Sequence, residues 1–410
     1  MKLAVLGAGF RFPLAKQFQE HGAEIVAVVE PRDDRQDRAA SIIGPGFRRL
    51  GHHRELVALR DDGGLDAAIV LTPDHTHAEI ASDLLHAGIP VYLEKPLAIT
   101  IDDCDRILRA AREAQTRLYV GHNMRHMRFV QMMKEIIDEG RIGEVQAIWC
   151  RHFVGYGGDF YFKDWHAERA KSAGLLLQKA AHDIDVIHLL AGARTTIASG
   201  MGRLAVYGQI EDRRDNDDRL MGPRASVDHW PPLAQTELNP VIDVEDLSHV
   251  QMRLANDVLV TYNQCHFTPD YWRNYTVIGT EGRIENFGDG PGGSIKLWNR
   301  RGAYRPEPDE EWTIPAAEGG HGGADFSITL EFLDFVRDGT ATLTSPTAAR
   351  DAVAAALAAT ASIRSGSVPT AVAELDPAVR AYFDAGQPRE RDAEPIGTVS
   401  GFGHNTVKNC

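Results

Sequence analysis

The chain has 410 residues, a length that predicts two or three domains, each large enough to bury its own core. Its 58 acidic residues against 44 lysines and arginines give a net charge of −14 at pH 7, and because negative charge repels phosphate backbones we expect no nucleic-acid partner. No stretch approaches the roughly 20 apolar residues of a membrane-spanning helix, and no signal pattern follows Met1. We therefore expect a cytoplasmic protein that does not contact a membrane.

The cysteines and histidines give no indication of a metal site. Cys104, Cys150, Cys265 and Cys410 are far apart and form no CxxC pair, which argues against a zinc site and a disulfide framework. His182 and His188 are six positions apart, unlike the spacing of four that places two ligands on one helix face. We expect reduced cysteines and no bound metal.

The first 122 residues alternate short apolar runs with helical patterns. The expected strands are 2–6, 24–29, 67–71, 90–92 and 117–120, and the expected helices are 13–21, 33–42, 76–87 and 101–115. Such alternation is typical of βαβ units and a parallel sheet. It predicts an α/β protein whose N-terminal domain, residues 1–122, is a Rossmann fold with a doubly wound parallel sheet.

A different pattern follows, in which strands come in succession rather than alternating with helices. Expected strands are 144–154, 196–207, 247–254, 258–267, 273–279, 282–286 and 294–298, and expected helices are 129–139, 174–190, 325–338 and 346–364. This order predicts an α+β domain at 123–385 with a mainly antiparallel open sheet, including a hairpin at 255–257. Residues 208–243 are charged, rich in proline and aperiodic, so we expect a long insertion there, and residues 386–410 form a polar C-terminal tail.

The tip of the first expected strand has the pattern of a phosphate-binding turn. Gly7 permits a tight turn, Gly9 lets the backbone approach a pyrophosphate, and a helix follows directly. Phe12 occupies the position of the usual third glycine, which loosens the match to GxGxxG. We expect this turn, including Phe10 and Arg11, to bind a dinucleotide cofactor.

The end of the second expected strand indicates which cofactor binds. Glu30 lies where a carboxylate accepts hydrogen bonds from the adenosine ribose diol, which favours NAD. Arg32 and Arg35 are close enough to receive a 2′-phosphate, so NADP is the less favoured alternative.

Two further segments are more specific. Residues 71–77 read LTPDHTH, and residues 88–98 read GIPVYLEKPLA. With these, the chain resembles the Gfo/Idh/MocA oxidoreductases, whose Rossmann domain has TPxxxH after the fourth strand and EKP after the fifth. The resemblance continues through the segments NMR at 123–125, GRIGEV at 140–145, GTEG at 279–282 and GHGGAD at 320–325. It covers nearly the whole chain, apart from the insertion and the tail.

The resemblance implies roles for several residues. Lys95 would lie beside the nicotinamide and the substrate hydroxyl, with Glu94 near the nicotinamide ribose, and the peptide bond between Lys95 and Pro96 would be cis. Thr72, Pro73, His77 and Asn123 would also bind the cofactor. The physical argument agrees for Lys95, because an ammonium at the carboxyl edge of a parallel sheet reaches the ligand crevice and can polarise a carbonyl or stabilise an alkoxide.

Residues 173–185, AGLLLQKAAHDID, correspond to a family helix with the pattern GG-x-L-x-D-x-G-x-H-x-x-D. His182 and Asp185 are retained, but Gln178 replaces the Asp. In a helix, Gln178, His182 and Asp185 share one face. An imidazole of pKa about 6.5 suits proton transfer at neutral pH, so we expect Lys95, His182 and Asp185 to be catalytic. Gln178 cannot titrate, so Lys179 is an alternative residue for the role of the missing Asp.

Other residues are candidates for the same cleft. By resemblance, Trp165 and Arg169 would contact the cofactor, and an aromatic wall beside polar donors suits a sugar ring. The expected substrate-binding residues are Lys95, Arg125, His166, Gln178, Lys179, His182 and His266.

The leading hypothesis is an NAD(P)-dependent oxidoreductase that transfers a hydride between the nicotinamide and a sugar, polyol or related carbohydrate. Two alternatives are an NAD-dependent, redox-neutral glycoside hydrolase or eliminase, and a cofactor-binding sensor without catalysis. A half-apolar antiparallel sheet needs a covering surface, and the family usually buries it against another subunit, so we expect a homodimer or homotetramer.

Overall fold

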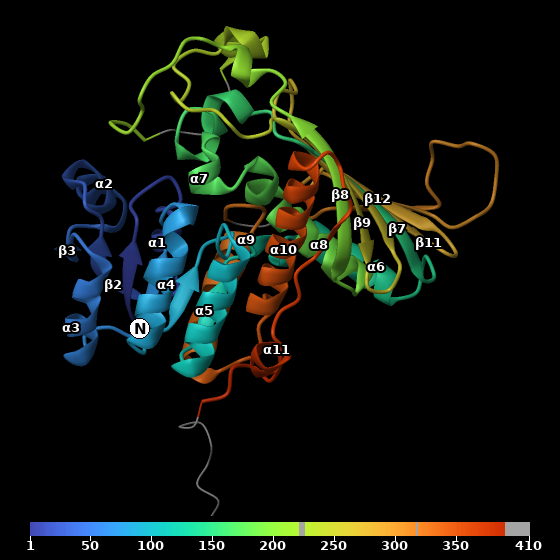
Figure 1. Ribbon diagram of the computed structural model, residues 1–410. Helices are drawn as coiled ribbons and strands as arrows, with labels where there is room; N and C mark the ends of the chain where they lie inside the picture. Colours follow the sequence, from blue (N-terminus) through green and yellow to red (C-terminus); the bar gives the residue numbers. More distant parts are fainter. Residues whose placement is uncertain (221–225, 317–318, 390–410) are drawn as a thin grey trace, which may run out of the picture.

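The computed structural model describes residues 1–220, 226–316 and 319–389. The described residues form two sheets, one in each of two parts that lie side by side (Figure 1). The N-terminal part is a Rossmann domain with a parallel sheet, and the second part is an α+β domain with a mainly antiparallel sheet. The predicted fold class is confirmed.

The first sheet has six parallel strands in the order β3-β2-β1-β4-β5-β6. Its strands are β1 Lys2–Leu6, β2 Glu24–Val29, β3 Arg48–Leu50, β4 Ala67–Val70, β5 Val91–Leu93 and β6 Leu118–Val120. The helices are α1 Leu14–Glu20, α2 Asp33–Ile43, α3 Leu56–Asp61, α4 His77–His86 and α5 Ile101–Glu113. In a doubly wound sheet of this order, ligands bind beyond the carboxyl ends of the strands, where β1 and β4 diverge in connectivity.

The expected strands of this domain are present, with ends that differ by one or two residues. Their residues are almost wholly buried, as in β4 and β5, because helices cover both faces of the sheet. The expected start of α5 is also present, since the Thr100 hydroxyl accepts a hydrogen bond of 3.1 Å from the Asp103 amide. The sequence did not indicate β3 or α3, because both are short and β3 has two exposed arginines.

The second sheet has nine strands in the order β14-β13-β12-β11-β7-β10-β9-β8-β15. They are β7 Val145–Phe153, β8 Thr195–Arg203, β9 Leu247–Leu254, β10 Leu259–Cys265, β11 Trp272–Gly279, β12 Arg283–Phe287, β13 Ser294–Trp298, β14 Glu310–Thr313 and β15 Thr370–Ala371. Neighbouring strands are antiparallel except β7 and β10, which are parallel. The expected hairpin joins β9 to β10, with Asp257 at a φ of 63°.

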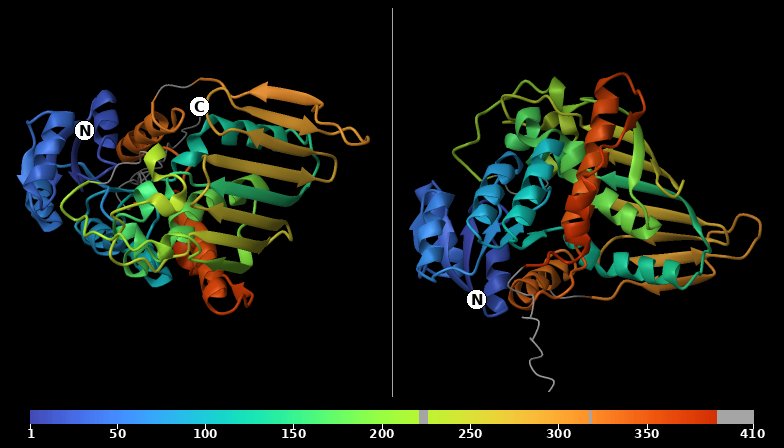
Figure 2. Two further views of the ribbon diagram at one scale, coloured as in Figure 1. Left: turned by 90° about the horizontal axis from the view of Figure 1, so that it is seen from above. Right: turned by 60° about the horizontal axis from the view of Figure 1, so that its bottom comes forward.

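The helices of the second domain are α6 Arg128–Asp138, α7 Arg169–Ser172, α8 Leu175–Ala191, α9 Ala324–Asp338, α10 Pro346–Arg364 and α11 Pro377–Asp384. Helices α6, α8 and α10 lie against one face of the second sheet (Figure 2). Helix α10 also contacts α5 of the Rossmann domain, and one hydrophobic cluster includes Leu108 of α5 and Val353 of α10. A shared core therefore fixes the two domains relative to each other.

Several features of this domain were not expected. The strand predicted at 196–207 ends at Arg203, and the sequence did not indicate the short elements β14, β15 and α11. The described part of the 208–243 insertion has short 3-10 turns, and its Ile210 and Leu238 pack in one cluster with Tyr207 and Phe162 of the domain. Most of the predicted tail, from residue 390 on, lies outside the described residues. No helix in the described part of the chain is long and apolar enough to cross a membrane.

Candidate active site

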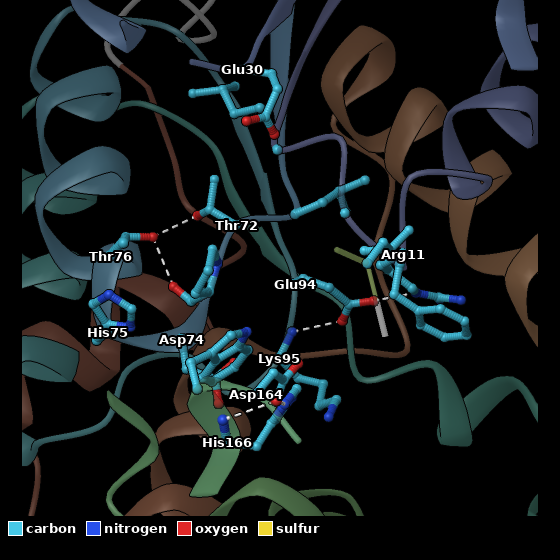
Figure 3. A pocket seen from close by; sticks show the side chains of 18 of the residues that line it. Arg11, Glu30, Thr72, Asp74, His75, Thr76, Glu94, Lys95, Asp164 and His166 are labelled. Atoms are coloured by element: carbon cyan, nitrogen blue, oxygen red, sulfur yellow. Dashed lines mark hydrogen bonds and ion pairs between the residues drawn. The ribbon is translucent and has the colours of Figure 1, made fainter. Parts of the chain in front are cut away.

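A cavity of about 820 Å³ lies at the carboxyl edge of the parallel sheet (Figure 3). Residues that follow β1, β2, β4 and β5 form one wall, and α8, residues 160–166 and part of the insertion form the other. The sequence-predicted residues in this wall are Gly7, Gly9, Phe10, Arg11, Glu30, Thr72, Pro73, Glu94, Lys95, Asn123, Trp165, His166, Gln178, Lys179 and His182. The cavity is therefore where most of the predicted site comes together.

The turn after β1 forms an open backbone cradle. Gly7 has a φ of +88°, and a Cβ there would lie 2.9 Å from the Leu71 carbonyl oxygen, so only glycine fits without a backbone shift. A Cβ on Gly9 would meet no atom within 4 Å, which leaves the space beside it free. Phe12 is fully buried beneath the turn. The cradle fits a dinucleotide pyrophosphate, which binds at this point of the fold.

Glu30 is held rigidly at the end of β2. It is 6% exposed, and its carboxylate accepts hydrogen bonds from the Ala8 amide at 2.9 Å and the Arg32 amide at 3.2 Å. The Arg32 guanidinium is bound by Asp34 at 2.8 Å and by the Asp218 carbonyl at 3.2 Å, so it is directed to the insertion. The position of Glu30 suits a ribose diol.

Glu94 and Arg11 form part of a charge cluster between the domains. Arg11 donates to Glu94 at 2.5 Å and to the two carboxylate oxygens of Asp325 at 2.6 and 2.8 Å, and Asn123 donates to Asp325 at 3.0 Å. Burial acts to raise the pKa of the Asp325 carboxyl, but hydrogen bonds from Arg11 and His321 outweigh it and lower that pKa. The cluster joins the cofactor turn to the start of α9.

The TPxxxH and EKP segments are tied together by His77. Its Nδ1 lies 2.8 Å from the Pro96 carbonyl oxygen and its Nε2 lies 2.9 Å from the Thr72 carbonyl oxygen. The peptide bond between Lys95 and Pro96 is cis, as predicted. His77 is fully buried behind the wall, so the structure gives it a positioning contact between two cavity segments.

A chain of hydrogen bonds runs from Lys95 through Gln178 of α8 to Asp74. The Lys95 Nζ atom donates to the Gln178 Oε1 atom at 2.9 Å and to the Gln178 carbonyl oxygen at 3.2 Å. The Gln178 Nε2 atom lies 3.1 Å from an Asp74 carboxylate oxygen. Burial lowers the pKa of Lys95, against the charges of Asp74 and Glu94, and burial raises the pKa of Asp74.

His182 lines the cavity one helical turn beyond Gln178. Burial, followed by the charges of Lys95 and His122, lowers the pKa of His182 well below its ordinary value, so the imidazole is neutral at pH 7. Its Nδ1 atom is buried and has no hydrogen-bond partner among the described residues. A neutral imidazole beside a lysine ammonium can accept a proton from a hydroxyl that the ammonium polarises.

A second charge network lies beneath the cavity, around Asp183 of α8. Its carboxylate contacts the Arg273 Nε atom at 3.0 Å, the His152 Nδ1 atom at 2.9 Å and the hydroxyls of Tyr262 and Tyr275 at 2.9 and 2.5 Å. Burial raises the pKa of Asp183, but Arg273 and His152 outweigh it and lower that pKa. The network fixes Arg273 of β11 in the cavity wall.

Aromatic side chains form the wall opposite the sheet. Trp165 and His166 stack with ring centroids 3.7 Å apart, and the His166 Nδ1 atom bonds Asp164. Phe160 contacts Phe10 of the cofactor turn edge-on, with centroids 5.4 Å apart. Figure 3 shows the cavity residues from Glu30 at one end to Asp164 and His166 at the other. The wall suits a ring-shaped ligand.

Five predicted residues do not lie in the wall: His77, Arg125, Arg169, Asp185 and His266. Asp185 and Arg125 pair in a bidentate contact of 2.7 Å that joins α8 to residues 123–126. Arg169 faces Glu245 at 3.3 Å. His266 is fully buried, with its Nε2 atom 2.8 Å from the Gln264 amide nitrogen. Each of these five side chains contacts another residue of the protein instead of the cavity.

Some wall residues were missed by sequence reasoning. Asp74 follows the TP pair of the motif directly, so its place at the carboxyl end of β4 was a usable signal. Arg273 sits in a strand that is buried along most of its length, and Tyr161 in a glycine-rich loop, and nothing local distinguishes either. Asn216 and Arg219 come from the insertion, whose contacts are long-range.

Fold and cavity together define a two-domain, dinucleotide-dependent oxidoreductase. Residues 1–122 match the NAD-binding Rossmann fold of an oxidoreductase family, and residues 134–372 match the C-terminal alpha/beta domain of the same family. The chain belongs to the Gfo/Idh/MocA oxidoreductases. It is an NAD(P)-dependent enzyme, as predicted.

Relatives of known sequence and structure share this organisation. The chain is 28% identical over 370 residues to YteT of Bacillus subtilis (strain 168), named as an oxidoreductase, a match that covers 80% of this chain and 85% of that protein. It is 29% identical to the inositol 2-dehydrogenase of Burkholderia multivorans, covering 86% and 90%. A levoglucosan dehydrogenase structure with NADH and levoglucosan has a TM-score of 0.71 at 19% identity, covering 91% of this chain and 100% of that one, which shows a shared fold.

Proposed function

We propose that the chain is an NAD-dependent dehydrogenase of a sugar, a polyol or a related carbohydrate, and that the reaction takes place between Lys95 and His182. The observation that carries this proposal is the presence of both side chains in one cavity, at the carboxyl edge of the Rossmann sheet. The inositol and levoglucosan substrates in the names of two similar proteins support a carbohydrate.

The cradle at Gly7 and Gly9 would hold the cofactor pyrophosphate, and Glu30 would accept hydrogen bonds from the adenosine ribose. Glu30 supports NAD rather than NADP because a carboxylate repels a 2′-phosphate. Arg32 is bound by Asp34 and by the insertion, which leaves it poorly placed to receive that phosphate.

The bound nicotinamide supplies the hydride acceptor or donor. Lys95 would polarise the substrate oxygen and stabilise negative charge on it, because its ammonium is held in place by Gln178. His182 would take the hydroxyl proton during oxidation and return it during reduction. Trp165 and Phe160 would exclude water from the reacting carbon.

The test is a panel of free sugars, polyols and aryl glycosides with NAD or NADP, in which absorbance at 340 nm and aglycone release are followed together. We expect NADH to form with a free sugar or polyol, and Lys95→Met to lower kcat by about 10²–10³-fold, the usual cost of removing one group that stabilises negative charge on the reacting oxygen. Lys16→Met, on the exposed side of α1, is the control. Full turnover by Lys95→Met would contradict the proposal, and aglycone release without net NADH would indicate the redox-neutral glycosidase instead.

We also propose that the protein is a homodimer or homotetramer. Helices α6, α8 and α10 cover one face of the second sheet, whereas the other face exposes Trp149, Met201 and Leu259 by 54%, 69% and 59%. Exposed apolar side chains on neighbouring strands favour a protein partner. Light scattering should give a mass of two or four chains, and Trp149→Glu should lower it. A monomeric wild type would contradict this proposal.

A further inference from the structure

Lys179 is a cation in the cavity wall without an anion of its own. It follows Gln178 on α8 and lines the same cavity as Lys95 and His182. Its Nζ atom lies 4.3 Å from the centroid of the Tyr161 ring, a cation–π contact that fixes the ammonium. Within residues 1–220, 226–316 and 319–389, no carboxylate lies within ion-pair distance of this atom and no hydrogen bond from it is present.

The two carboxylates whose charge reaches Lys179 are already bound by other groups. Asp183 and Asp74 act to raise the pKa of Lys179, but burial, Lys95 and Arg273 outweigh them and lower it well below its ordinary value. Asp183 is bound by Arg273, His152 and two tyrosine hydroxyls, and Asp74 is bound by Gln178. The protein therefore places a lysine among other cations without a carboxylate of its own, so the protonated amine is disfavoured until an anion lies beside it.

Charging this amine without a partner is costly, so a lysine that faces a ligand cavity among other cations indicates an anionic group on the ligand, whose charge favours the ammonium. We propose that the substrate is an acidic carbohydrate, a uronic or aldonic acid, whose carboxylate binds Lys179 beside Arg273. This inference rests on the proposed function, and it names the substrate class of the same cavity.

The arrangement of α8 makes this substrate geometrically consistent. Gln178, Lys179 and His182 lie within about one turn of the helix, so a carboxylate at Lys179 and a reacting hydroxyl at Lys95 and His182 belong to one small molecule. Arg273 is held by Asp183 through Nε, and Arg273 also lines the cavity. One free ammonium matches a monoanion better than a phosphate, which carries up to two charges and demands more donors.

The experiment compares acidic sugars with their neutral partners on the holoenzyme. Binding to the NADH-loaded protein is measured by calorimetry for glucuronate and glucose, galacturonate and galactose, gluconate and glucitol, and glucose 6-phosphate, and turnover with NAD is followed separately at 340 nm. We expect at least one acid to bind tenfold or more tighter than its neutral partner. We expect Lys179→Met to weaken binding of the acid by tenfold or more, so that the acid and its neutral partner then bind within about threefold of each other.

Lys296→Met is the matched control, because Lys296 also lies over an aromatic ring, at 4.7 Å from Phe287, but on β13 and paired with Glu311 at 3.6 Å. It should keep the preference for the acid. Failure of every acid to bind tighter than its neutral partner overturns the inference, as does tighter binding of the sugar phosphate. A Lys179→Met variant that loses kcat equally on acidic and neutral substrates also overturns it, because that result would make Lys179 a proton acceptor. Acid-selective binding without NADH formation would support the inference and contradict the proposed dehydrogenase.

Discussion

The Lys95 ammonium donates a hydrogen bond of 2.9 Å to the Gln178 side-chain oxygen, an amide at the position where the family pattern has an aspartate. The other end of that amide reaches Asp74, which follows β4 in the Rossmann domain. A carboxylate is thus still connected to the lysine, but it comes from the same Rossmann wall as Lys95 rather than from α8, and the Gln178 amide bridges the two side chains.

This arrangement predicts that Asp74 and Gln178 are coupled. Gln178→Asp would place two buried carboxylates in contact with each other. Asp74→Asn would remove the carboxylate that is linked to Lys95 through the Gln178 side chain. Each variant should therefore lower kcat/KM by tenfold or more. The double variant Asp74→Asn with Gln178→Asp retains one carboxylate and one amide and should recover most of the loss, a coupling of about 1–3 kcal/mol. Steady-state kinetics of the four proteins measures it. Additive losses in the double variant would show that the two residues act independently.

Glu30 should determine the choice of cofactor. Glu30→Ser removes the acceptor proposed for the ribose diol, so KM for NAD should rise by about tenfold or more, whereas KM for NADP should rise less or fall. Because Glu30 also binds the Ala8 amide, thermal unfolding of the variant must be measured with the kinetics. Equal changes in KM for the two cofactors would mean that Glu30 only supports the turn.

In the pH profile of the oxidation rate, both the acid and the alkaline limb should lie at lower pH than the ordinary pKa values of histidine and lysine would give. His182 must be neutral to accept a proton. Because its pKa is lowered, it becomes protonated only at a pH under the ordinary histidine value of about 6.5, so the acid limb of the rate profile should lie under this value. Lys95 must be charged to polarise oxygen, and its lowered pKa should bring the alkaline limb under pH 10.5. The charged and titratable groups whose charges lower the pKa of His182 are Lys95, His122, Arg273 and Lys179. His182→Gln should abolish the acid limb, and a limb that persists unchanged would assign it to another group.

Much of this molecule was accessible from the sequence because the relevant signals are local. The glycine turn at Gly7, the EKP segment and the strands of the Rossmann domain follow from short patterns with a fixed place in the fold, and the structure confirms them. The signal for the α8 residues is also local, because their helical spacing places Gln178 and His182 on one face, which lines the cavity.

What the sequence did not indicate depends on contacts between distant segments. The helical spacing places Asp185 on the same face of α8 as His182. In the structure Asp185 does not line the cavity, because its carboxylate is bound by Arg125. Arg273 lines the cavity with its guanidinium held by Asp183, 90 positions earlier in the chain. Arg11 and Glu94 were expected at the cofactor. That Arg11 forms ion pairs with both Glu94 and Asp325 depends on how α9 packs in the folded protein.

The buried network at Asp183 predicts a loss of stability in mild acid. Burial and the charge of Arg273 lower the pKa of His152 to about 4, below the value of roughly 6.5 of an unfolded histidine. The unfolded chain therefore binds this proton more readily, so the stabilisation is present above pH 6.5 and is lost as the pH falls toward 4.

For one histidine with this pKa, the loss of unfolding free energy between pH 7 and pH 5 is about 2 kcal/mol. Urea unfolding at the two pH values should show that His152→Gln loses about 2 kcal/mol less than the wild type over this interval, even if it is less stable at pH 7. His249→Gln, on the exposed face of β9, is the control and should behave as the wild type does. An unchanged pH dependence in His152→Gln would show that His152 does not titrate on unfolding.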